Sequence, residues 1–215
     1  TRGTVTIPEK IDGKYTVRAV GTKAFENCAS LTNIILPDTI TEFADYAFEN
    51  CKALTGIRLP SELERMEPFS FYGCSALTSV SIPDRVYQIS DGCFIGCSNL
   101  KNIVLGARLS EIGNNVFECT PDTLVIKNPE TSCSDDSFVY TKIADVYYAG
   151  GRYDWMSDQS HFNFYSRSKD GTSRNWASIG KIHFNYSGDT VMAPVFGKKA
   201  GAYPRGFSLE ITCPT

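Results

Sequence analysis

The sequence predicts a right-handed solenoid in which each repeat adds one short strand to a single parallel ribbon. Three observations favour this fold class. The segment AFENCASLTNIILP (24–37) returns as AFENCKALTGIRLP (47–60), and each copy ends at a residue suited to stopping a strand. Phenylalanine recurs every 23 residues, and a fixed period near this length is typical of solenoids. The phenylalanines occupy positions 25, 48, 71, 94 and 117.

Each repeat contains one strand whose side chains alternate between core and surface. In the first full repeat, Leu31, Ile34 and Leu36 are expected to point inward, whereas Asn33 and Ile35 point outward. A proline ends such a strand because it has no N–H for the next ladder bond. The residues at this position in four equivalent repeats are Pro37, Pro60, Pro83 and Gly106.

The rest of each repeat is predicted to be a connecting turn and then a short helical turn on the convex side. Ile40 and Phe43 point inward from the connecting turn, and Phe48 fills the middle of the core. The residue before each repeated cysteine ends the helical turn in the left-handed conformation, which Gly and Asn tolerate. These residues are Asn27, Asn50, Gly73 and Gly96.

The whole pattern resembles the bacterial surface-antigen (BspA-type) leucine-rich repeat, whose unit reads L-x-x-I-x-L-P-x-x-L-x-x-I-x-x-x-A-F-x-x-C. The resemblance covers residues 1–148 and implies a leucine-rich-repeat solenoid that is mostly β. It also implies adhesion to proteins of a host or of a neighbouring cell. One departure is that no Asn follows the strand, so another group must satisfy the backbone of that turn. Those positions hold Thr39, Glu62, Arg85 and Arg108.

Both ends of the solenoid are predicted to be modified, because solenoids require caps. An insertion near the N-terminus contains a turn at Asp12-Gly13. The solenoid is predicted over residues 1–187, with about eight parallel strands. An irregular, aromatic-rich excursion, 149–178, interrupts the terminal repeat. Residues 188–215 are predicted to be a C-terminal capping tail that contains a strand.

The cysteines are predicted to be reduced and structural. Stacked repeats place equivalent cysteines in one ladder, where parallel Cβ vectors make a disulfide strained even at a Cα separation of roughly 5 Å. Free Cys packs as a small buried hydrophobe. Cys119 lies one residue early for the ladder, and Cys93 is a further packing residue. Cys133 and Cys213 fall outside the pattern, and their redox state stays open. The four ladder residues are Cys28, Cys51, Cys74 and Cys97.

Length, charge and hydropathy argue against several classes of partner. The chain has 215 residues, with 21 basic and 24 acidic side chains and a net charge of −3. This balance disfavours nucleic-acid binding and a polybasic membrane patch, because both need a basic surface. No apolar run approaches 18 residues, so no transmembrane segment is predicted. The chain begins with Thr1 and not with Met, and we interpret it as a mature or trimmed chain without its export signal.

The sequence contains no recognisable catalytic, metal or cofactor motif. The only histidines are His161 and His183, and His183 is expected to be a solvated residue on the outer side of a strand. G-x-S-x-G, H-E-x-x-H, C-x-x-C and phosphate-loop patterns are absent. We therefore predict that the protein is not an enzyme and needs no cofactor or metal.

The candidate ligand-binding surface is the concave face formed by the outward strand residues. These side chains are mixed, mostly small and carry little charge, which suits contact with a protein because the ribbon presents them at regular spacing. An ordinary solvated sheet face is the alternative. The residues are Asn33, Ile35, Gly56, Arg58, Ser79, Ser81, Asn102, Val104 and Lys127.

The sequence thus favours a non-catalytic, extracellular or cell-surface module that binds a protein partner. Two other functions stay open. Exposed aromatic residues of 149–178, Trp155 above all, are candidates for carbohydrate binding, although they also suit closure of the hydrophobic end of the solenoid. A passive spacer that holds another domain away from the surface is the third interpretation.

Overall fold

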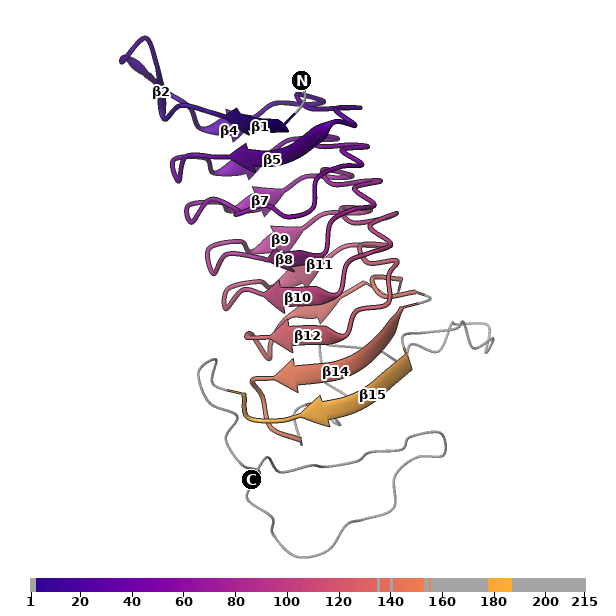
Figure 1. Ribbon diagram of the computed structural model, residues 1–215. Coiled ribbons are helices and arrows are strands. Elements are labelled where there is room, and N and C mark those ends of the chain that lie inside the picture. The colour runs from indigo at the N-terminus through magenta and orange to yellow at the C-terminus, as the bar shows by residue number, and fades with distance from the viewer. Residues whose placement is uncertain (1–2, 135, 140, 153–154, 156–177, 187–215) are drawn as a thin grey trace, which may run out of the picture.

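The chain forms an elongated stack of coils with a parallel strand ladder on each of two opposite sides (Figure 1). The computed structural model describes residues 3–134, 136–139, 141–152, 155 and 178–186. The predicted solenoid of parallel strands is confirmed, because all the strand pairings that link successive repeats are parallel. Residues 187–215, with the predicted tail and Cys213, lie outside the described residues.

The first ladder contains the strands that the sequence predicted. Its two parts are β1-β5 and β8-β10-β12-β14-β15, and residues 54–60 between them form no strand. Gly56 lies in that gap, and glycine weakens strands because it is flexible and has no side chain to pack. The strands are β1 (Gly3–Thr6), β5 (Leu31–Ile35), β8 (Ser79–Ser81), β10 (Asn102–Leu105), β12 (Thr123–Ile126), β14 (Lys142–Tyr148) and β15 (Ser178–His183).

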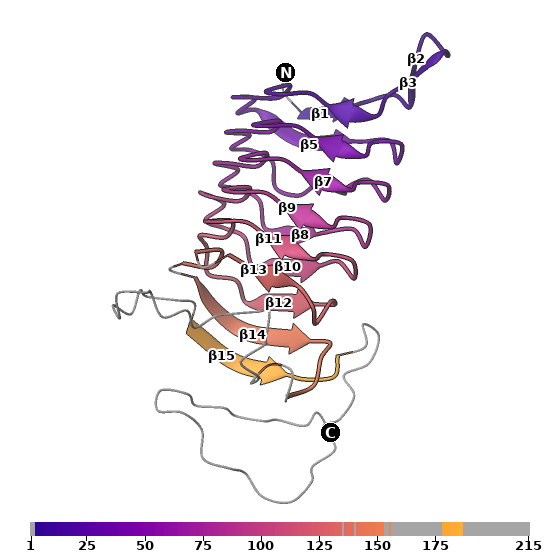
Figure 2. The same ribbon diagram turned by 180° about the vertical axis from the view of Figure 1, so that it is seen from behind.

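A second parallel ladder occupies the position where the sequence predicted only a connecting turn. Figure 2 shows the stack from behind, with β7, β9, β11 and β13 of this ladder labelled. Each strand places one side chain outward and the next inward, as Glu42 and the fully buried Phe43 illustrate. The strands are β4 (Ala19–Val20), β6 (Glu42–Phe43), β7 (Arg65–Met66), β9 (Gln88–Ile89), β11 (Glu111–Ile112) and β13 (Ser132–Cys133).

The predicted helical turns around each Phe are in fact successive hydrogen-bonded turns. The N–H of Phe48 donates to the Ser70 carbonyl of the next repeat at 2.8 Å, and the N–H of Asn50 donates to the Tyr72 carbonyl at 2.7 Å. The intervening N–H of Glu49 instead donates to Tyr46, within its own turn. Because alternate N–H groups donate to carbonyls of the next repeat and not to carbonyls of their own turn, a continuous helical ladder cannot form.

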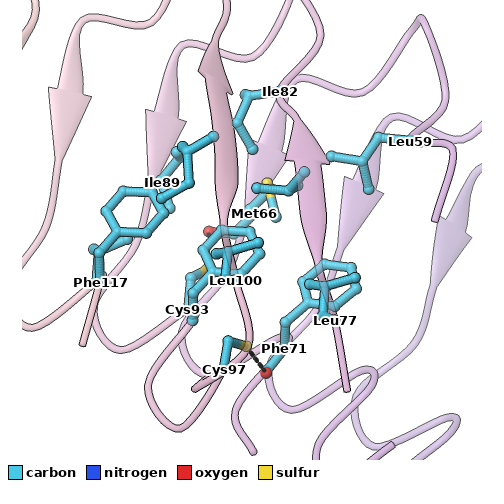
Figure 3. Close-up of a cluster of buried hydrophobic side chains, with 14 of the residues drawn as sticks. Leu59, Met66, Phe71, Leu77, Ile82, Ile89, Cys93, Cys97, Leu100 and Phe117 are labelled. Atoms are coloured by element: carbon cyan, nitrogen blue, oxygen red, sulfur yellow. Dashed lines mark hydrogen bonds between the residues drawn. The ribbon is translucent and has the colours of Figure 1, made fainter. Parts of the chain in front are cut away.

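The core is built around a continuous stack of phenylalanine rings. The five rings predicted from the period stack face to face, and Phe138 extends the series although it follows Phe117 by only 21 residues. Phe71 is fully buried in the middle of this stack (Figure 3). Successive ring centroids are 5.3, 5.0, 5.4, 5.4 and 5.1 Å apart from Phe25 to Phe138.

The cysteine ladder is reduced, as predicted, and its thiols have a specific hydrogen-bonding role. Cys97 Sγ lies 3.3 Å from the carbonyl oxygen of Phe71 in the preceding repeat (Figure 3). Cys74 and Cys51 make the equivalent bond, each at 3.2 Å. All seven cysteines of the described part of the chain are free. Cys133, which the sequence left unplaced, is half-buried in β13.

Two left-handed residues per repeat shape the turns, and the sequence predicted one of them. Asn27, Asn50, Gly73 and Gly96 have φ values between 56° and 76°, as expected. The second position, four residues earlier, was missed because its residues are of mixed type and include bulky ones that rarely adopt this conformation. It holds Lys23, Tyr46, Phe69 and Gly92, with φ values between 58° and 67°.

The N-terminal insertion folds as a hairpin that projects beyond the end of the stack (Figure 1). Its strands, β2 (Lys10–Ile11) and β3 (Tyr15–Thr16), pair antiparallel. The predicted turn is confirmed, because Asp12 and Gly13 both have positive φ. At the opposite end, β15 pairs with β14 and is the last strand of the first ladder among the described residues.

Candidate functional site

The outward residues of the first ladder form two parallel rows, because equivalent residues pair directly across neighbouring strands. Asn102 lies between Ser79 and Thr123 in one row, and Val104 lies between Ser81 and Val125 in the other. Asn33 and Ile35 are exposed on β5, which the strand gap at residues 54–60 separates from these rows, and 52% of the Ile35 surface is exposed. The predicted residues that are exposed are Asn33, Ile35, Arg58, Ser79, Ser81 and Asn102, whereas Gly56, Val104 and Lys127 are half-buried.

The two basic residues of the predicted face are held by ion pairs near its border. Arg58 Nη2 lies 2.9 Å from Asp38 Oδ2, and Lys127 Nζ lies 3.1 Å from Asp84 Oδ1. Arg58 and the N–H of Ser61 lower the pKa of Asp38 to about 2 by stabilising the carboxylate. Because these cations are already paired, the face itself carries little net charge.

The carboxylates of Asp38 and Asp84 also satisfy backbone groups of the turn, where the sequence has no asparagine after the strand. Asp38 Oδ1 accepts a hydrogen bond from the N–H of Ser61 at 2.7 Å, and Asp84 Oδ1 accepts one from Ala107 at 3.0 Å. Each bond joins one repeat to the next. Carboxylates directly after the strand-ending proline therefore satisfy turn N–H groups of the following repeat.

The C-terminal end of the two rows carries an aromatic cluster that the sequence did not indicate. Tyr147 and His183 are paired across β14 and β15, and their rings stack with centroids 4.4 Å apart. His183 Nε2 lies 2.9 Å from Asp145 Oδ1, and only 16% of the His183 side chain is exposed. His183 does point outward from its strand. The expectation that it is solvated is nevertheless wrong, because the Tyr147 ring covers it. Tyr186 also contacts Tyr147, with centroids 5.5 Å apart.

Trp155, the leading carbohydrate candidate, is half-buried and packs at the end of the core. Its ring meets Tyr148 edge to face at 5.0 Å and Phe184 at 6.4 Å. This packing favours a role in closing the solenoid. The other aromatic residues of the excursion, Tyr153, Phe162, Phe164, Tyr165 and Trp176, lie outside the described residues.

A second surface feature is an aromatic row on the turn edge, at the left-handed positions. The rings of Tyr46 and Phe69 stack with centroids 5.1 Å apart, and Lys23 Nζ lies 5.4 Å from the Tyr46 centroid. Tyr72 meets Phe69 edge to face. A Cβ on Gly92 would lie 2.3 Å from the Phe69 ring, so a larger residue at the next rung would require that ring to shift. The 23-residue spacing of Tyr46 and Phe69 is the sequence signal that could have predicted this row.

The described residues offer little for chemistry. No group of three or more His, Cys, Asp or Glu side chains among them is arranged to hold a metal ion. Burial raises the pKa of both Cys93 and Cys119 to about 12, so these thiols are poor nucleophiles. Within the same residues, no helix is both long and apolar enough to cross a membrane.

The period, the parallel ladders and the inward Leu/Ile positions together define a leucine-rich-repeat solenoid. The chain belongs to the BspA type leucine rich repeat family, whose model matches it in six copies over residues 18–145. No curated protein matches the chain.

Two solved structures share the fold. A leucine-rich repeat protein of T. pallidum is 24% identical, with a TM-score of 0.53, over 84% of this chain and 72% of that one. A leucine-rich cell surface protein of Faecalibacterium prausnitzii is 19% identical, with a TM-score of 0.52, over 87% of this chain. The match spans about half of that longer protein, 48%. At these identities the likeness concerns the fold alone.

Proposed function

We propose that this protein is a non-catalytic module, outside the cell or at its surface, that binds a protein partner. The observation that carries this proposal is the row arrangement on the first ladder. Small exposed side chains, such as Ser79, Ser81 and Asn102, lie in direct register on adjacent strands. A flat surface of small side chains lets a partner approach the strands closely, while the polar groups offer hydrogen bonds at regular spacing.

Family membership and one structural relative support the location. The chain belongs to the BspA type repeat family, and the F. prausnitzii relative is described as a cell surface protein. The partner we propose is a protein of a host or of a neighbouring cell. Arg58, at the border of the face with 69% of its side chain exposed, is the residue best placed to contribute a charged contact.

The test is binding of the purified chain to an array of extracellular-matrix and bacterial surface proteins, compared between two charge-reversal variants. Arg58→Glu alters the proposed face. Arg65→Glu is the matched control, because Arg65 lies on the second ladder and also forms an ion pair, with Glu42 at 2.9 Å. We expect binding to be lost with Arg58→Glu and retained with Arg65→Glu, with both variants folded by circular dichroism. Equal binding by the two variants, or no partner on the array, would count against the proposal.

A further inference from the structure

The first ladder is interrupted in the middle of the stack, although the coil that would supply the missing strand is in place. Within the described chain, β5 pairs only with β1 and β8 pairs only with β10, and residues 54–60 between them form no strand (Figure 1). The second ladder is continuous here, from β6 through β7 to β9. Leu54 and Leu59 are buried, and Phe48 stacks on Phe71 at 5.0 Å. Core packing therefore continues across the interruption, and only the strand pairing is lost.

The interruption leaves backbone polar groups without a protein partner. In the described part of the chain, no backbone N–H of residues 55–59 donates a hydrogen bond, and Thr55 is the only one of them whose carbonyl accepts any. It accepts from the N–H of Thr78 at 3.1 Å and from the Thr78 hydroxyl at 3.0 Å. One repeat later, the N–H of Ile82 donates to the Val104 carbonyl at 2.8 Å. Backbone groups of a folded chain normally have such partners, so the unpaired segment (residues 55–59) is exceptional within this fold.

The unpaired segment lies on the proposed binding face and is open to an approaching molecule. Thr55 and Arg58 are exposed, and Gly56 and Ile57 are half-buried. A Cβ on Gly56 would meet no other atom within 4 Å, so the space next to this glycine is free. A partner can therefore come close to the backbone at this point of the face.

The groups of the unpaired segment match the backbone of an extended polypeptide. Such a chain supplies N–H and C=O groups in alternation, and it binds exposed strands by forming the hydrogen bonds that a neighbouring strand would form. Arg58 adds a preference for charge. Among the described residues its one hydrogen-bond partner is Asp38, which Nη2 contacts, so its other N–H groups are free to hold a carboxylate.

We propose that the unpaired segment binds an extended segment of the partner protein through backbone hydrogen bonds, with an Asp or Glu side chain of that partner on Arg58. This inference rests on the proposed protein-binding function and specifies the form in which the partner is recognised. The partner contributes a stretch of extended chain, and the small side chains of the surrounding face leave room for it.

The probe is a peptide selected from a library of short random sequences on the intact chain and then synthesised. Its affinity is measured for the wild type, for Gly56→Val and for Gly21→Val. Gly21→Val is the matched control, because a Cβ on Gly21 also meets no atom within 4 Å, neither glycine has positive φ, and Gly21 follows β4 of the second ladder. We expect binding at least ~10-fold weaker for Gly56→Val, because valine fills the approach to the backbone and favours strand pairing within the ladder. Gly21→Val should bind as the wild type does.

Two further measurements with the same peptide report on the backbone directly. Amide hydrogen exchange at residues 55–59 should be fast in the free chain and slowed in the complex. N-methylation of single peptide residues should weaken binding about 10-fold at alternate positions and leave it unchanged at the positions between them, because alternate N–H groups of an extended chain point to the same side.

The inference is overturned if no peptide is selected, if exchange is slowed only outside residues 55–59, or if Gly56→Val or N-methylation leaves the affinity unchanged. Circular dichroism of both glycine variants separates loss of binding from loss of folding. A protein from the array that binds the wild type and not Arg58→Glu, without slowing exchange at residues 55–59, would overturn this inference alone and leave the proposed function standing.

Discussion

Replacement of Phe71 by alanine is the sharpest test of the aromatic stack. Phe71 is fully buried, stacks on Phe48 at 5.0 Å and on Phe94 at 5.4 Å, and meets Phe43 edge to face at 5.8 Å. Burying an aromatic side chain removes roughly 150–250 Å² from water, worth about 4–6 kcal/mol at about 25 cal/mol per Å². The alanine side chain retains a small part of this burial free energy, and each lost ring contact adds about 0.5–1.5 kcal/mol to the cost of the substitution.

Measured Phe→Ala substitutions in cores cost about 3–5 kcal/mol, and contacts on both ring faces place Phe71 toward the upper end. For a domain of this size, that loss lowers the melting temperature by about 6–20 °C. Urea unfolding followed by circular dichroism gives the free energy directly. Tyr87→Ala is the control, since Tyr87 is 43% exposed. Equal effects of Phe71→Ala and Tyr87→Ala would refute the stacked core.

Two further predictions concern a turn and a border carboxylate. Gly92→Ala should destabilise the fold by about 1–3 kcal/mol, because its Cβ meets the Phe69 ring in addition to the cost of positive φ. Gly13→Ala is the control, because Gly13 also has positive φ but a Cβ there would meet no other atom, so it measures the cost of positive φ alone. An equal loss of stability in the two variants would argue against a clash between position 92 and the Phe69 ring. Asp38→Asn should reduce stability above about pH 4, because the pKa of Asp38 is lowered from 3.8 to about 2 in the folded protein. The difference from wild type should shrink as the pH falls toward 2, and chemical unfolding at pH 6 and pH 2 checks this sign.

The repeat period made the core of this fold predictable. Phe, Leu and Ile positions, the left-handed Asn and Gly residues and the reduced cysteines each recur several times, so every copy supports the same interpretation. The second ladder was missed because each of its strands has only two residues, such as Glu42–Phe43, which is too short for an alternation signal. Its hydrogen bonds come from the neighbouring repeats and leave no local trace in the sequence.

The candidate site was predictable where it depends on strand alternation and unpredictable where it depends on contacts between repeats. Alternation identified Ser79 and Asn102 as exposed. The pairing of Arg58 with Asp38 depends on how two successive repeats are stacked. A strand after the 149–178 excursion was predicted, and β15 does pair with β14, but strand alternation alone does not show that the Tyr147 ring covers His183.

The unequal contacts along the turn edge bear on the order in which the coils assemble. Near-identical repeats can dock on the wrong neighbour during folding, since a skipped coil would still present matching core residues. Gly92 leaves room on the far side of the Phe69 ring, where a Cβ would require the ring to shift, while the near side of the ring stacks on Tyr46. Gly73 likewise leaves room for the Asn50 side chain, because a Cβ there would lie 2.4 Å from Asn50 Oδ1. Because these contacts differ from one pair of coils to the next, docking in the correct order differs in free energy from docking that skips a coil.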